Sequence, residues 1–194
     1  MEWLIVGIPQ AVGFSHYLLE NHLKNGDFAI DATCGNGYDT EFLAELVGKD
    51  GKVLAIDIQA DAINNTKELL KARGLFKQVE VKQGDHSNID KLAEEFSREI
   101  KAIIYNLGYL PGGDKKIITE ADNTLRSCEK AVKLLARQGL LVITMYPGHE
   151  GGRLERDRLL DWASKLGGKK YNVAYYSFLN QPGNPPEVIG VFKR

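Results

Sequence analysis

The chain has 194 residues and a mass of 21.6 kDa, so we expect residues 1–194 to form a single domain. Its content of 43% hydrophobic and 26% charged residues excludes disordered, collagen-like and disulfide-stapled proteins. No apolar run approaches the roughly 20 residues of a membrane span, and Pro9 interrupts the short apolar start, so we expect neither a membrane anchor nor a signal peptide. The only cysteines, Cys34 and Cys128, fit a reduced cytoplasm and are too few for a cysteine-rich zinc site. We therefore expect a cytoplasmic protein that holds no metal.

Charge is divided unevenly along the chain. Residues 1–100 carry 10 Lys and Arg against 17 Asp and Glu, whereas residues 101–194 carry 15 against 9, although the net charge is only −1. This asymmetry indicates an anionic partner for the second half, and the alternative is a chance placement of surface charge.

Hydrophobic spacing and turn residues predict alternating helices and strands in chain order. The first half is expected to contain a helix over 10–24, a strand over 28–32, a helix around 42–47, a strand over 52–57, a helix over 60–73 that stops at Gly74, a strand over 78–82 and a helix from Ser87 or Asn88 to Phe96. The second half is expected to contain a strand over 102–105, a loop over 107–118, a helix over 120–137, a strand over 140–145, a helix over 152–166 and strands over about 171–179 and 187–192.

This alternation requires an α/β fold, with a mostly parallel sheet and helices on both faces. The last two strands have no helix between them, so they pair locally and at least one runs antiparallel. Five strand–helix units followed by two strands match the order of the Rossmann-like class I methyltransferase fold. That fold has a seven-stranded, mostly parallel sheet with an antiparallel C-terminal hairpin. A plain dinucleotide-binding fold would add further helices.

The first of three polar loops at the carboxyl edge of the expected sheet follows the strand over 28–32. It reads Asp-Ala-Thr-Cys-Gly-Asn-Gly-Tyr-Asp-Thr, and its two glycines allow a tight turn beside a ligand. Thr40 stands where a dinucleotide fingerprint needs its third glycine. The acidic-x-x-x-Gly-x-Gly pattern resembles the first motif of S-adenosylmethionine (SAM)-dependent methyltransferases, with Asp31 complementing the cationic cofactor. The candidate cofactor residues of this loop are Asp31, Thr33, Gly35, Asn36, Gly37, Asp39 and Thr40.

Two further loops carry carboxylates in register with the first. Asp57 ends the strand over 52–57, where a carboxylate can accept both hydroxyl protons of a ribose, and Gln59 can reach the same ribose. Asp85 and His86 follow the next strand. In SAM-dependent enzymes an acidic residue there accepts from the adenine amine, and His86 can stack on the purine or line its pocket. The alternative role for both aspartates is helix capping.

The loop after the fourth strand is the candidate catalytic loop. It reads Asn106-Leu-Gly-Tyr-Leu-Pro-Gly-Gly-Asp, and it resembles the Asn-Pro-Pro-Tyr motif of amino-group methyltransferases, with Leu107 and Gly108 in place of the prolines. In that motif the asparagine accepts hydrogen bonds from the target amine, and the aromatic ring stacks on the base. The resemblance assigns these roles to Asn106, which also faces the cofactor, and to Tyr109.

Three motifs together resemble one bacterial family, long labelled putative rRNA methylase and understood as tRNA 5-(aminomethyl)-2-thiouridine methyltransferases. They are Asp31-Ala-Thr-Cys-Gly-Asn-Gly, Asn106-Leu-Gly-Tyr-Leu-Pro-Gly-Gly-Asp-Lys and Tyr146-Pro-Gly-His-Glu-Gly-Gly. The resemblance covers essentially the whole chain. It implies SAM as cofactor, the tRNA anticodon loop as partner, and methylation of the 5-aminomethyl group of wobble 2-thiouridine to 5-methylaminomethyl-2-thiouridine.

The acceptor amine must lose a proton before it attacks, and His149 is a candidate acceptor because a histidine titrates near neutral pH. A contact with RNA is the alternative role for His149. The opening helix over 10–24 is expected to pack at the cofactor site, with His16 near the methionine end of SAM. The candidate RNA-binding residues around the catalytic mouth are Lys115, Lys116, Arg153 and Arg156.

Several alternatives stay open at this point. An rRNA or small-molecule amine N-methyltransferase would use the same fold. An NAD(P)-dependent oxidoreductase is disfavoured by Thr40, and a non-catalytic module that binds SAM or RNA is disfavoured by the presence of Asn106 and Tyr109. A homodimer is equally open, because the sequence does not determine the oligomeric state.

Overall fold

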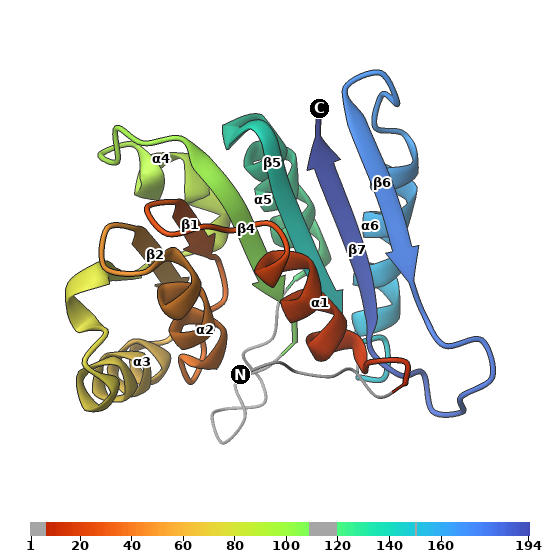
Figure 1. Cartoon of the computed structure of the whole chain (residues 1–194). Helices are drawn as coiled ribbons and strands as arrows, with labels where there is room; N and C mark the ends of the chain where they lie inside the picture. Colours follow the sequence, from red (N-terminus) through yellow and green to blue (C-terminus); the bar gives the residue numbers. More distant parts are fainter. Residues whose placement is uncertain (1–6, 109–119, 150) are drawn as a thin grey trace.

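In the computed structural model the chain is built around one seven-stranded sheet with the strand order β3-β2-β1-β4-β5-β7-β6 (Figure 1). The structure describes residues 7–108, 120–149 and 151–194. The strands are β1 Phe28–Asp31, β2 Lys52–Asp57, β3 Val79–Gln83, β4 Ile100–Asn106, β5 Leu135–Met145, β6 Tyr171–Tyr176 and β7 Glu187–Lys193. The helices are α1 Ala11–Glu20, α2 Tyr38–Val47, α3 Ala60–Arg73, α4 Ile89–Ala93, α5 Ala121–Leu134 and α6 Gly152–Ser164, with short 3-10 turns η1 Phe76–Gln78 and η2 His86–Asn88.

Strand direction follows the predicted pattern. β1 pairs in parallel with β2 and β4, and the parallel set continues to β3 on one side and β5 on the other. β7 inserts between β5 and β6 and is antiparallel to both. The seven-stranded, mostly parallel sheet with an antiparallel C-terminal pair is confirmed. All five parallel strands therefore end at the same edge, where their loops meet.

Both faces of the sheet are covered by helices, as Figure 1 shows. Residues of β1 alternate between two hydrophobic cores: Phe28 and Ile30 belong to the core that contains residues of α4, α5 and α6, and Ala29 belongs to the core that contains residues of α1, α2 and α3. Burial on both faces explains the near-continuous apolar sequence of the central strands. None of the described helices is long and apolar enough to cross a membrane.

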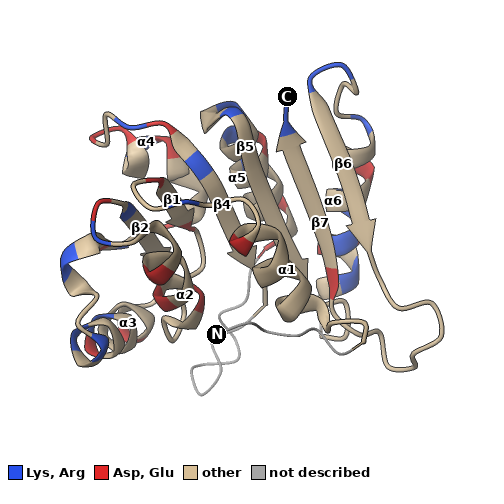
Figure 2. Ribbon diagram, in the orientation of Figure 1, with Lys and Arg blue, Asp and Glu red and all other residues tan. Residues whose placement is uncertain are grey.

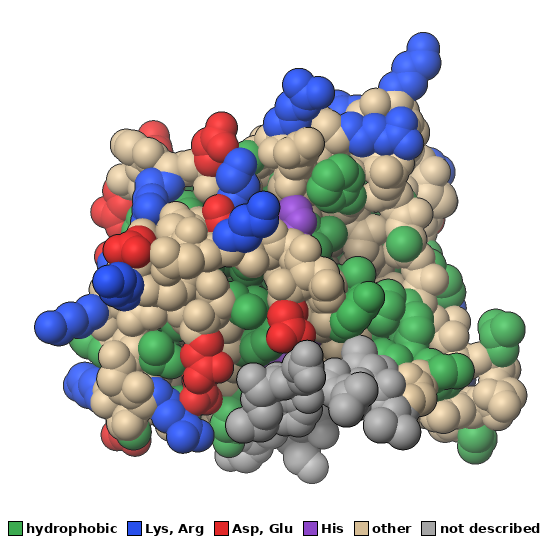
Figure 3. Space-filling model, in the orientation of Figure 1, with side chains coloured by type: hydrophobic (Ala, Val, Ile, Leu, Met, Phe, Trp, Pro, Cys, Tyr) green, Lys and Arg blue, Asp and Glu red, His purple; other side chains and the backbone are tan. Residues whose placement is uncertain are grey.

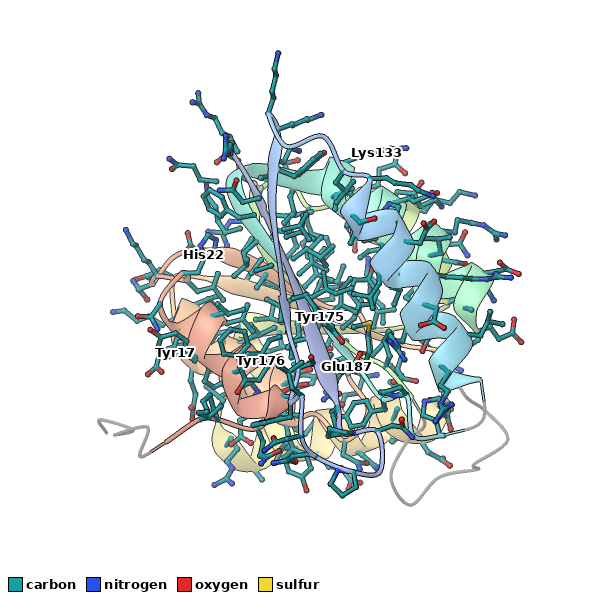
Figure 4. All side chains as sticks on the ribbon, turned by 90° about the vertical axis from the view of Figure 1, so that its right-hand side faces the viewer. Tyr17, His22, Lys133, Tyr175, Tyr176 and Glu187 are labelled. Atoms are coloured by element: carbon teal, nitrogen blue, oxygen red, sulfur yellow. The ribbon has the colours of Figure 1, made fainter. Side chains whose placement is uncertain are left out.

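α1 lies against the antiparallel edge of the sheet and is fixed there by aromatic contacts. The Phe14 ring stacks on the Tyr176 ring at a centroid distance of 4.1 Å, and the Tyr176 hydroxyl donates to the Pro9 carbonyl. Figure 4 shows Tyr176 beside this helix. Because α1 is anchored in this way, its opposite side is presented to the loops at the carboxyl edge.

Several element boundaries differ from the sequence prediction by two residues or more. The helices expected over 10–24 and up to Phe96 end at Glu20 and Ala93, and the strand expected over 171–179 ends at Tyr176. The helix expected over 120–137 ends at Leu134, because Leu135 instead pairs with Ile100 and opens β5. A buried leucine satisfies a helical and a strand pattern equally, so hydrophobic spacing cannot place this boundary. Most of the loop predicted over 107–118 lies outside the described residues.

Candidate active site

A cavity of about 990 Å3 opens at the carboxyl ends of the parallel strands. Loops after β1, β2, β3, β4 and β5 line it, and α1 and the segment between β6 and β7 close its sides. The lining residues that the sequence predicted are Thr33, Gly35, Asn36, Asp39, Asp57, Gln59, Asp85, His86, Asn106 and His149. Residues from five loops far apart in the sequence are thus brought to one hollow. Tyr109, Lys115 and Lys116, predicted for catalysis and RNA binding, lie outside the described residues.

The loop between β1 and α2 turns through two glycines with positive φ. Gly35 has φ +51° and donates its N–H to Asp57 Oδ2 at 3.0 Å, so the first and second loops are tied together. Gly37 has φ +89° and precedes the first turn of α2. A Cβ there would lie 3.0 Å from the Thr66 Cα, so a side chain would press on α3 as well as strain the backbone.

Asp31 lies beneath this loop and is fully buried. Its two oxygens accept the Thr33 N–H at 3.1 Å and the Thr40 hydroxyl at 2.6 Å. Burial, and then the negative charge of Asp39, raise the pKa of Asp31 to about 8. Asp31, Gly37 and Thr40 therefore support the loop from behind, whereas their predicted neighbours Thr33, Gly35, Asn36 and Asp39 face the cavity.

Asp31→Asn should flatten the pH dependence of stability. The folded protein holds the Asp31 proton up to a pKa of about 8, whereas an unfolded chain releases it near 3.8, so the unfolded state binds fewer protons in this window. The free energy of unfolding must therefore fall as the pH rises from about 4 to 8, an effect that the uncharged variant lacks. Thermal unfolding of both proteins between pH 5 and 8.5 measures this. Parallel curves for the two proteins would show that Asp31 is ionised in the fold.

The second and third loops form one wall of the cavity. Asp57 accepts the Gln59 N–H at 2.9 Å as well as that of Gly35, which fixes its carboxylate at the end of β2. Asp85 accepts the Ser87 N–H at 2.7 Å and caps η2, so its predicted alternative as a helix cap is observed while it also faces the cavity. Burial lowers the pKa of His86, which favours a neutral imidazole in this wall.

Asn106 ends β4, lines the cavity and is held by two hydrogen bonds. Its backbone N–H donates to Thr33 Oγ1 at 2.7 Å, and its carboxamide nitrogen donates to Asp39 Oδ2 at 3.0 Å. A carboxylate can only accept hydrogen bonds, so Asp39 turns the amide nitrogen toward itself and the amide oxygen away. His149 lines the same cavity and lies beside Gly108, where an added Cβ would be 3.6 Å from His149 Nε2.

Some residues of the cavity were absent from the sequence prediction of the site. Tyr146 lines it from the loop after β5, and burial raises the pKa of its phenol. The signal for Tyr146 was its place at the head of the third motif, immediately after an apolar strand. Glu120, Asn123 and Asn184 also line the cavity, and no pattern in the sequence distinguishes them from ordinary loop and helix residues.

The two arginines predicted to bind RNA occupy different environments. Arg153 is exposed, and its guanidinium donates to Asn184 Oδ1 at 3.2 Å, so it stands at the mouth of the cavity. Arg156 is partly buried, and its Nε lies 3.1 Å from Asp157 Oδ1 and 3.7 Å from Glu187 Oε2. Glu187 is labelled in Figure 4. The charge of Arg156 is thus offset by two carboxylates, which leaves Arg153 as the stronger candidate.

One group of basic residues in the described part of the second half lies away from the cavity. Figure 2 places Lys and Arg positions at the upper ends of β5, β6 and β7, opposite the edge where the parallel strands end, and Figure 3 shows basic side chains on the same part of the surface. The basic residues at these strand ends are Arg137, Lys169, Lys170, Lys193 and Arg194. The charge asymmetry of the sequence therefore does not by itself identify the mouth of the site.

Known proteins share both this sequence and this architecture. The family model described as "Putative rRNA methylase" matches residues 53–191. The chloroplastic tRNA (mnm(5)s(2)U34)-methyltransferase of Arabidopsis thaliana is 37% identical over 198 residues, which cover 98% of this chain and 72% of the relative. A "putative rRNA-methylase" from Clostridium thermocellum superimposes with a TM-score of 0.93 at 37% identity, covering 97% of this chain and 100% of that one. A "putative methyltransferase" from Streptococcus mutans in complex with SAH gives 0.86 at 34% identity, with coverage of 97% and 100%.

Proposed function

Because this chain belongs to the "putative rRNA methylase" family of SAM-dependent methyltransferases, we propose that it methylates the 5-aminomethyl group of 2-thiouridine at the wobble position of tRNA. The observation that carries this proposal is the fixed carboxamide of Asn106 in the lining of the cavity. An amide oxygen held in place suits an acceptor that carries N–H groups. The 37% identical relative is itself named for a modified uridine at position 34 of tRNA.

The residues of the cavity fit SAM as its cofactor. The hollow is large enough for a nucleoside with a methionine tail, and the glycine loop offers close backbone approach. We assign Asp57 and Gln59 to the ribose, Asp85 and His86 to the adenine, and the loop between β1 and α2 to the methionine end. When bound, SAM supplies an electrophilic methyl group on a positively charged sulfur.

The acceptor nitrogen must reach that methyl group as a neutral amine with its lone pair in line. The Asn106 oxygen accepts an acceptor N–H and so directs the lone pair, a contribution of positioning. An aliphatic amine is largely an ammonium ion near neutral pH, so the acceptor must lose a proton before its nitrogen can take the methyl group that bound SAM would supply. His149 lines the same cavity and is our candidate for receiving this proton, with an RNA contact as its alternative role.

A wobble uridine lies in a loop, so turning it into the cavity costs less than flipping a base out of a duplex.

Arg153→Glu should raise the Michaelis constant for tRNA and reduce its dependence on salt, because an exposed cation at the mouth becomes an anion. Arg156→Gln is the comparison, and we expect a smaller effect because Asp157 and Glu187 already offset its charge. Steady-state rates at several salt concentrations measure both. If Arg153→Glu leaves both the Michaelis constant for tRNA and its salt dependence unchanged, the RNA binds elsewhere.

The proposed reaction is tested with purified protein, labelled SAM and tRNA that carries 5-aminomethyl-2-thiouridine, followed by mass spectrometry of the nucleosides. We expect the aminomethyl nucleoside to gain one methyl group. The same tRNA without the aminomethyl group is the control, and it should stay unlabelled. Methylation of the control, or of ribosomal RNA in place of tRNA, would overturn the proposed acceptor.

A further inference from the structure

Three side chains from distant parts of the sequence form one hydrogen-bonded row along the cavity. His16 Nε2 of α1 lies 2.6 Å from Asp39 Oδ1, and Asp39 Oδ2 accepts from Asn106 Nδ2 at 3.0 Å. All three side chains line the cavity. Asp39 stands at the centre of the row, and each of its two oxygens has its own partner.

We propose that Asp39 is a positioning residue for methyl transfer, which fixes the carboxamide of Asn106 with its oxygen toward the acceptor amine. This proposal rests on the proposed function, because it assumes an acceptor that presents N–H groups. The two ends of a carboxamide are almost the same in shape, so packing alone distinguishes them poorly. A carboxylate accepts and never donates, so an ionised Asp39 permits only one of the two orientations. In the opposite orientation the amide N–H groups would face the N–H groups of the acceptor.

The surroundings keep Asp39 itself in place. It sits in the first turn of α2, and its side chain is only 10% exposed. The His16 ring that contacts it stacks on the Phe42 ring at a centroid distance of 4.0 Å and an interplanar angle of 11°. α1 and α2 therefore hold one oxygen of Asp39, which leaves the other oxygen directed at Asn106.

A contact between Asp39 and the cationic cofactor is the competing role, and the two roles predict different kinetics. A cofactor ligand contributes to SAM affinity, so its loss is overcome by saturating SAM. A positioning residue contributes to the rate at saturation, because a misaimed nucleophile loses its attack geometry even when both substrates are bound. The two roles also differ in whether the rate losses from substitutions at Asp39 and Asn106 add. They add if Asp39 binds the cofactor, and they do not add if Asp39 acts through Asn106.

Asp39→Asn is the decisive variant, because it keeps the shape of the side chain and can donate as well as accept. We expect single-turnover methylation at saturating SAM to fall by about ten- to a hundred-fold, with the dissociation constant for SAM changed by less than about three-fold. In the Asn106→Ala background, Asp39→Asn should cause almost no further loss, because the group it orients is gone. Asp85→Asn removes a carboxylate from the same cavity without touching Asn106, and its effect should fall on SAM affinity and add to that of Asn106→Ala.

Substitution of His16 gives a second test if Asp39→Asn fails to fold, which thermal unfolding would reveal. His16→Ala frees one oxygen of Asp39 and should slow methyl transfer, and His16→Gln should restore part of the rate because its amide can donate to Asp39. The wild-type protein is assayed first on tRNA with the aminomethyl group. No transfer by the wild type would refute the proposed function. A wild type that is active, together with an Asp39→Asn variant of equal rate or with losses that add to those of Asn106→Ala, would refute the positioning role.

Discussion

Asp57→Ala is expected to weaken SAM binding by about ten- to a hundred-fold, roughly 1.5–3 kcal/mol. Asp57 lies at the carboxyl end of β2 and faces the cavity, where its carboxylate is held by the N–H groups of Gly35 and Gln59. Each carboxylate oxygen accepts more than one hydrogen bond, so both oxygens remain able to accept from ribose hydroxyls. Calorimetric titration with SAM and with SAH measures the loss.

Asp57→Ala also removes the acceptor of two backbone amides, so part of its effect falls on the loop itself. Asp57→Asn separates these contributions, because it keeps an acceptor oxygen and loses the charge. Asp61→Ala, at the exposed first turn of α3, is the matched control and should leave SAM affinity unchanged. If Asp57→Ala remains folded and binds SAM as tightly as the wild type, the ribose is held by other residues.

The topology of the sheet could be predicted because its causes are local. Alternating apolar strands and amphipathic helices determine a parallel sheet, and two closing strands without a helix between them determine an antiparallel pair. The boundaries of the helices and strands were harder to predict from the sequence. Leu135 fits the end of α5 and the start of β5 equally well, and only the pairing with Ile100 in the folded sheet decides between them.

The candidate site was predictable where residues follow directly on a strand. Asp57 and Asn106 were identified from their positions at the ends of β2 and β4, and Asp85 from its position just after β3, and all three line one cavity. The position of Asp31 beneath the loop could not be predicted, because the sequence pattern is the same whether the carboxylate points into the cavity or beneath the loop. The contact between His16 and Asp39 joins residues 23 positions apart through the packing of two helices, and no local pattern encodes it.

Similarity to known proteins and the geometry of the site support different parts of the proposed reaction. Similarity to the family shows a SAM-dependent methyltransferase, whereas an acceptor amine is argued from Asn106 and its partners Thr33 and Asp39. Because the amine is the part of the reaction that rests on this geometry, variants of Asn106 test the proposal most directly.

Asn106→Ala is expected to reduce turnover by about two orders of magnitude with SAM binding nearly intact, because the acceptor amine loses the group that aims it. The backbone N–H of residue 106 can still donate to Thr33 Oγ1 in this variant, so the end of β4 should keep its position. The assay is methyl transfer from labelled SAM to tRNA with 5-aminomethyl-2-thiouridine, alongside calorimetric titration with SAM. Wild-type turnover in Asn106→Ala would make Asn106 a structural residue only.

Asn106→Asp is the more informative change, because it introduces charge at nearly constant shape. The new carboxylate would face that of Asp39, whose oxygen lies 3.0 Å from the present amide nitrogen, with no N–H left to donate between them. Two carboxylates this close repel, and a cation beside them offsets the repulsion. An acceptor ammonium beside two carboxylates is stabilised, so the pKa of the bound acceptor rises and its neutral fraction at a given pH falls. The reactive amine then appears only at higher pH. The pH optimum of single-turnover methylation, measured from pH 6 to 10, should therefore move upward in Asn106→Asp and stay unchanged in Asn106→Ala. An unshifted optimum in Asn106→Asp would place the acceptor nitrogen away from this residue and overturn the amine-orienting mechanism.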